Sequence, residues 1–110
     1  MKLEEQLRVY AEEKIKVQGI GHIVELKEIK AYLLDKYCTN PSSVIPADHC
    51  YNRVNNGISI NSKTFFEYMG GGKYKILGPD YPYNGKIYAK HKDEPEMVVG
   101  ECVNGTRVLY

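Results

Sequence analysis

A change of pattern near residue 57 constrains this chain more than any other feature of its sequence. Before that point, apolar residues recur every three or four positions, which is typical of helices that cover a core. After it, short runs of β-branched and aromatic residues lie between glycine-containing turns, which is typical of strands and hairpins. A length of 110 residues has room for one core. We therefore expect a single α+β domain over residues 1–110.

Two helices and a short extended piece account for the first part of the chain. An apolar stripe that begins at Leu3 predicts a helix ending near Gln18, and the glycine-bracketed residues 19–25 fit a short extended piece. A second stripe predicts a helix over residues 26–37. The following Thr-Asn-Pro-Ser-Ser cluster indicates a turn, because a residue that precedes proline avoids the helical conformation.

A third helix and three hairpins complete the prediction. Pro46 suits a first helical turn and Gly57 a helix end, so we expect a short helix over residues 46–56. Three hairpin turns are expected at Gly70-Gly71-Gly72, Asn84-Gly85 and Asn104-Gly105. This order of three N-terminal helices followed by β-hairpins predicts a winged helix-turn-helix-like fold, whose third helix enters the major groove of DNA.

That fold assigns DNA-binding roles to polar residues in three places. Arg and Asn make paired hydrogen bonds to base edges, serine hydroxyls and backbone amides hold phosphates, and strand lysines beside an aromatic ring suit a phosphate backbone. The candidates are Ser42, Ser43, His49, Asn52, Arg53, Asn55, Asn56, Lys73, Lys75, Lys86, Tyr88, Lys90 and Lys92. The alternative is a structural third helix, in which Cys50, Tyr51 and Val54 pack inward and the polar residues face solvent.

Charge supports the DNA hypothesis only locally. The net charge of +1 gives no global attraction to nucleic acid, but residues 63–92 hold six lysines against two carboxylates, a local charge of +4. Strand alternation places Lys86, Tyr88, Lys90 and Lys92 on one face. Alternatively, these lysines only discourage edge pairing. The acidic residues 93–96 and Glu101 would repel phosphate if they faced the same way.

Other function classes receive less support. No local motif fixes a catalytic constellation, so we expect a chain that is not an enzyme and has no cofactor. Three widely spaced cysteines favour reduced thiols, and Cys38, His49 and Cys50 lack the spacing of a zinc knuckle. No secretion signal or apolar span is seen, so we expect a cytoplasmic protein without membrane contact. The ten tyrosines leave a protein partner open as an alternative.

One segment carries a resemblance. The string SVIPADHCYNRVN at residues 43–55, followed by Phe65-Phe66-Glu67-Tyr68 and the string YPYNG at residues 81–85, resembles an uncharacterised domain of bacterial and phage proteins. The resemblance implies a winged-helix module, sometimes found beside nuclease-type domains, and therefore a DNA-related role. It implies no catalytic residues.

Together these observations predict a non-enzymatic module that binds double-stranded DNA as a regulator or adaptor. The alternative is a protein-binding module, such as a phage inhibitor of a host enzyme, that uses its tyrosines and acidic segment. The DNA hypothesis requires the lysine-bearing hairpin and the arginine of the third helix to share one face. Oligomeric state, target and pathway stay open at this point.

Overall fold

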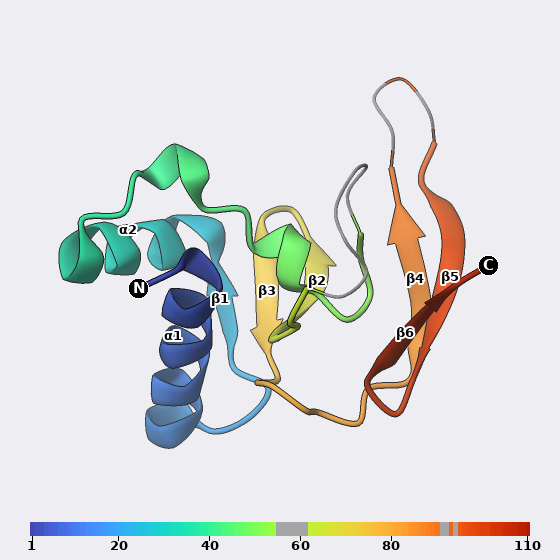
Figure 1. The fold of residues 1–110 in the computed structure, drawn as a ribbon, viewed down its shortest axis with the longest axis horizontal. Helices are drawn as coiled ribbons and strands as arrows, with labels where there is room; N and C mark the ends of the chain where they lie inside the picture. The colour runs from blue at the N-terminus through green and yellow to red at the C-terminus, as the bar shows by residue number, and fades with distance from the viewer. Residues whose placement is uncertain (55–61, 91–92, 94) are drawn as a thin grey trace.

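The structure is a computed structural model that describes residues 1–54, 62–90, 93 and 95–110. These residues form two α-helices and two three-stranded antiparallel sheets, with two short 3-10 helices between the second α-helix and the strand that follows it (Figure 1). The elements in chain order are α1 (Leu3–Gln18), β1 (Ile23–Glu25), α2 (Leu26–Tyr37), η1 (Pro41–Ser43), η2 (Pro46–His49), β2 (Phe66–Gly70), β3 (Lys73–Ile76), β4 (Gly85–Ala89), β5 (Met97–Val103) and β6 (Thr106–Leu109).

The helices begin and end where the sequence predicts. α1 buries Leu7, Tyr10 and Ala11 along one stripe, and it ends where Gly19 adopts a φ of 86° and donates its N–H to the carbonyl of Ile15. The burial of this stripe, rather than helix propensity alone, holds a helix of this length in place. β1 and α2 have the positions expected for them, so the prediction for residues 3–37 is confirmed.

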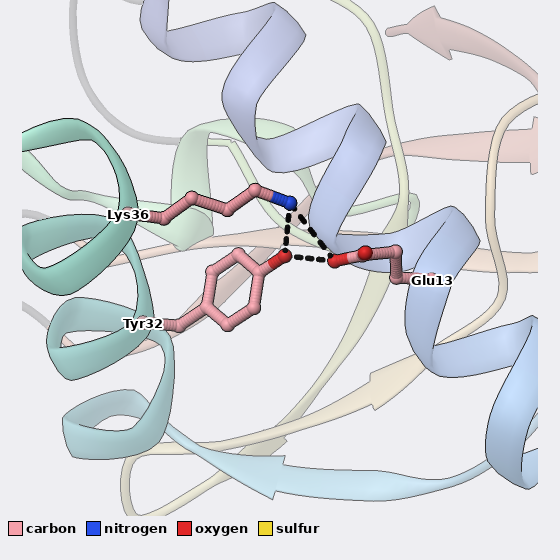
Figure 2. A network of polar contacts seen from close by, with 3 residues as sticks. All are labelled: Glu13, Tyr32 and Lys36. Atoms are coloured by element: carbon pink, nitrogen blue, oxygen red, sulfur yellow. Dashed lines mark hydrogen bonds and ion pairs between the residues drawn. The ribbon is translucent and has the colours of Figure 1, made fainter.

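A polar network ties α1 to α2 at their exposed side. Tyr32 donates a hydrogen bond to Glu13, and Lys36 Nζ lies 3.0 Å from the Tyr32 hydroxyl and 3.4 Å from Glu13 Oε2 (Figure 2). Beneath it, the rings of Tyr10 and Tyr32 meet edge to face with centroids 4.9 Å apart. The two helices therefore cover the first sheet as one unit.

The first sheet has the order β1-β3-β2 and packs against the helices. β2 and β3 form a hairpin around residues 70–72, which confirms the first predicted turn. The core between helices and sheet contains Leu33, Phe66 and Ile76, each with none of its surface exposed. The second sheet, with the order β4-β5-β6, lies at the opposite end of the molecule from α2 and has its own core around Tyr51, Ile87 and Cys102 (Figure 1).

Residues 50–54 join the two sheets, and we call them the linking segment. On one side the Tyr51 N–H donates to the carbonyl of Phe66 in β2 at 2.9 Å. On the other side, Tyr88 in β4 donates to Asn52 at 2.9 Å and accepts from Val54 at 3.1 Å. The bridges of Cys50 to Phe66 and of Arg53 to Tyr88 are parallel, and Cys50 and Arg53 form an antiparallel bridge with each other. The linking segment is therefore a tight turn whose two ends each pair with one sheet.

The predicted third helix is wrong. Residues 46–54 contain only the 3-10 turn Pro46–His49, and the linking segment that follows turns at Tyr51 and Asn52, with an antiparallel bridge between Cys50 and Arg53. Asn55 and Asn56 lie outside the described residues. The apolar spacing of Cys50, Tyr51 and Val54 fits a helix, but it fits equally a segment buried between two sheets. Backbone hydrogen bonds to β2 on one side and to β4 on the other favour this bridging turn over a helix.

The winged helix-turn-helix-like fold class is therefore wrong, because two helices and two three-stranded sheets replace three helices followed by hairpins. The Asn84-Gly85 hairpin is wrong as well: residues 79–84 form no strand, and Asn84 Oδ1 accepts the Asn104 N–H at 3.0 Å. The Asn104-Gly105 turn between β5 and β6 is confirmed, with φ values of 48° and 84°.

Among the described residues, neither helix is both long enough and apolar enough to pass through a membrane.

Candidate binding surface

The first three predicted DNA-binding residues, Ser42, Ser43 and His49, lie apart from the other predicted DNA-binding residues. Ser42 in η1 is held by Asn40, whose side chain accepts from the Ser42 N–H at 3.0 Å, and Ser43 lies beside it. η1 packs against α2, away from the second sheet. His49 is buried, with Nδ1 2.7 Å from the carbonyl oxygen of Lys63. These three residues do not join the other candidates.

The linking segment brings Asn52 and Arg53 together with Tyr88. The Asn52 side chain donates to the Tyr68 carbonyl at 3.0 Å and accepts the Tyr68 N–H at 2.8 Å, so both ends of its amide serve the fold. Arg53 forms a bridge with Tyr88, and its guanidinium carbon lies 4.5 Å from the centre of the Tyr68 ring. Asn52 is therefore a structural residue, whereas Arg53 faces a cleft.

That cleft lies between the two sheets and has a volume of about 240 Å³. The Arg53 side chain is 16% exposed and its Nη1 lies 2.9 Å from Glu96 Oε1, while the Glu96 side chain is 49% exposed. The arginine is neither free for base contacts nor fully interior. We call this space the Arg53 cleft, lined by Asn52, Arg53, Tyr68, Met69, Gly70, Tyr88 and Glu96.

Carboxylates lie beside several of the predicted cations. In addition to the Arg53 pair, Lys75 Nζ lies 3.6 Å from Glu67, and Lys86 Nζ lies 3.6 Å from Glu101. The hydrogen bond to Tyr110 and the negative charge of Glu101 raise the pKa of Lys86, so it stays protonated. The pairing of β4 with β5 brings Glu101 onto the lysine face, so a charge count over residues 63–92 overstates the positive field.

The remaining hairpin lysines show no common site. Lys73 is exposed at the start of β3 and Lys90 is exposed just after β4, while Lys92 lies outside the described residues. The predicted alternation along β4 is confirmed, because Lys86 and Tyr88 are exposed whereas Ile87 and Ala89 are buried. The exposed half of β4 belongs to a larger surface.

We call that surface the outer face of the second sheet. Strand register places Lys86, Glu101 and Val108 in one row across β4, β5 and β6. Lys86 also donates to the Tyr110 hydroxyl at 3.3 Å, which fixes Tyr110 on the same face. The outer face combines the Lys86–Glu101 pair with exposed apolar and aromatic side chains, namely Tyr88, Val98, Val103, Val108 and Tyr110.

The buried thiols lack the chemistry of nucleophiles. Burial raises the pKa of Cys50, which is fully enclosed and donates to the Pro46 carbonyl at 3.4 Å. Burial also raises the pKa of Cys102. Among the residues described, no three His, Cys, Asp or Glu side chains gather to hold a metal ion.

Comparison with known proteins places the chain in a family. A family model described as a domain of unknown function, DUF7225, matches residues 2–109. The chain belongs to this DUF7225 family. It is also 50% identical over 91 residues to the uncharacterized protein YnaC of Bacillus subtilis strain 168, a match that covers 82% of this chain and 34% of YnaC. The chain thus spans about a third of the length of that relative. No solved structure matches.

In this DUF7225 domain, sequence reasoning missed most residues of the outer face and the cleft. Val98, Val103 and Val108 lie beside other apolar residues of β5 and β6, so the sequence has no strict alternation that shows which face is buried. The sequence does draw attention to Glu96 and Glu101, because the lysine-rich residues 63–92 are followed by acidic residues. The uncharacterised bacterial family expected from the resemblance is confirmed.

Proposed function

We propose that this chain is a non-enzymatic protein-binding module and that it binds its partner through the outer face. The observation that carries the proposal is the gathering of five exposed apolar or aromatic side chains around one neutral Lys86–Glu101 pair. Exposed apolar and aromatic side chains gathered on one face of a sheet are characteristic of interaction sites. Tyrosine enrichment with few unpaired charges is the composition of an interface core.

The chemistry of the outer face defines the partner. A partner that covers Val103 and Val108 needs an apolar surface of its own, and at its centre it needs a polar pair that meets Lys86 and Glu101. Because that pair is neutral as a whole, association gains little from long-range charge attraction and depends weakly on salt. A protein strand or sheet face fits this description.

A binding experiment with matched variants tests the proposal. The immobilised chain is used to find a protein partner, which is then identified, purified and measured by calorimetry. We expect the Val103→Ser, Val108→Ser double variant to weaken that binding about tenfold or more, because two apolar contacts are lost. The control is Val17→Ser on α1, which is 78% exposed but lies outside the outer face. Binding that survives the double variant contradicts the proposal.

DNA binding, the first hypothesis of the sequence analysis, stays a prediction. A second experiment tests it beside the protein-binding experiment. A mobility shift of duplex DNA that weakens steeply between about 50 and 200 mM salt indicates phosphate contacts. If Lys86→Glu with Lys90→Glu abolishes such a shift while the outer-face double variant retains it, the DNA hypothesis replaces the protein hypothesis.

A further inference from the structure

The two halves of the Arg53–Glu96 ion pair differ in how firmly the fold holds them. Backbone hydrogen bonds join β4 to the residues on either side of Arg53, and the ring of Tyr68 supports its guanidinium. Glu96 precedes β5, outside the paired strands, and its side chain is about half exposed. The cation is therefore fixed in the cleft, whereas the carboxylate approaches it from the solvent side.

A partly buried guanidinium is stabilised by a carboxylate beside it, because a charge that has lost part of its water is costly when unpaired. Glu96 fills that role in the structure. An incoming carboxylate supplies the same hydrogen bonds, and the planar fork of arginine accommodates two carboxylate oxygens at once. Exchange of one carboxylate for another preserves the ion pair and leaves the fold unchanged.

We propose that the Arg53 cleft binds one Asp or Glu side chain of the protein partner, which displaces Glu96 from Arg53. A volume of about 240 Å³ suits a single side chain. The rings of Tyr68 and Tyr88 and the thioether of Met69 line the space around its methylene groups. This inference rests on the proposed function, since Tyr88 belongs both to the cleft and to the outer face.

Nuclear magnetic resonance titration tests the cleft without the partner. The probe is N-acetylglutamic acid α-amide, which carries one side-chain carboxylate, and its neutral match is N-acetylglutamine amide. We expect the acid to shift the Arg53 Nε–H signal and the ring signals of Tyr68 and Tyr88, and the amide to leave them in place. Inorganic phosphate is titrated in parallel.

Two variants sharpen the test. Glu96→Gln removes the competing carboxylate and should tighten probe binding about two- to fivefold, the range expected for loss of a half-exposed ion pair. Arg53→Lys retains the charge but lacks the planar fork, so it should weaken binding. The control is Glu101→Gln, which changes a carboxylate of the outer face and should leave probe binding unaltered.

Three results would overturn the inference: no shift of the cleft signals in the wild-type chain, equal binding in Arg53→Lys, or stronger binding of phosphate than of the acid. These results leave the proposed function standing if Val103→Ser, Val108→Ser still weakens partner binding about tenfold or more. Conversely, partner binding that survives the double variant contradicts the proposed function, whatever the probe response of the cleft.

Discussion

Gly100 is a residue of the second sheet that has no room for a side chain. A methyl group at this position would lie 2.3 Å from the carbonyl oxygen of Val108 and 2.9 Å from the Cα of Leu109. Gly100 is buried in β5, and β6 passes over it too closely for any side chain. The conformation of Gly100 is ordinary, so its requirement for glycine is one of space.

We therefore expect Gly100→Ala to lower the free energy of unfolding by about 1–3 kcal/mol, the usual cost of overpacking. Urea denaturation followed by circular dichroism measures this change. Val103→Ala on the same strand is the control, because Val103 is exposed and its change should cost less than about 0.5 kcal/mol. Equal effects of the two variants would show that β6 adjusts freely.

At the scale of elements, the linking segment depends on the side chain of Asn52. Its amide makes two hydrogen bonds to the backbone of Tyr68, as a neighbouring strand would. We expect Asn52→Ala to cost about 1–3 kcal/mol, because two partly buried backbone groups lose their partner. Asn84→Ala is the matched control: the Asn84 side chain also makes two hydrogen bonds to backbone groups, but both are exposed, so their loss should cost below about 1 kcal/mol. Thermal unfolding of both variants compares them, and a larger loss in the control would contradict this role.

Elements whose conformation is determined by residues within the same segment were predictable from the sequence. Elements whose conformation depends on contacts with residues far along the chain were not. α1, α2 and the β2–β3 hairpin follow from periodicity and glycine placement within each segment. The linking segment forms a bridging turn in place of a helix because β2 and β4, far along the chain, offer hydrogen bonds on both sides. The Arg53 cleft was predicted only in part: Arg53, Asn52 and Tyr88 were singled out, but Glu96 joins them only through the pairing of β4 with β5.

At the scale of the whole molecule, buried tyrosines make stability depend on alkaline pH. Burial is the main cause that raises the pKa of Tyr10 and Tyr74 above the ordinary value of 10.0. The unfolded chain releases these protons near pH 10, whereas the folded chain retains them. The unfolded state then binds fewer protons, so the free energy of unfolding falls as pH rises above about 10, and it is unaffected by these groups at pH 7.

We expect a loss of up to about 1.4 kcal/mol per pH unit for each such tyrosine, measured by urea unfolding between about pH 8 and 11. Tyr10→Phe separates one contribution, because the Tyr10 hydroxyl has no hydrogen-bond partner among the described residues and the ring packing is retained. This variant should show a shallower alkaline decline. A decline identical to that of the wild-type chain would show that Tyr10 ionises as easily in the folded state as in the unfolded state.

The parallel bridges of the linking segment also have a consequence for folding kinetics. Arg53 and Tyr88 are separated in the chain by β2, β3 and the residues before β4. A long loop must therefore close before these two residues can pair. Pairings between such distant residues slow folding relative to local hairpins. The helices and the β2–β3 hairpin should therefore form early, and docking of β4 onto the linking segment should complete the native state.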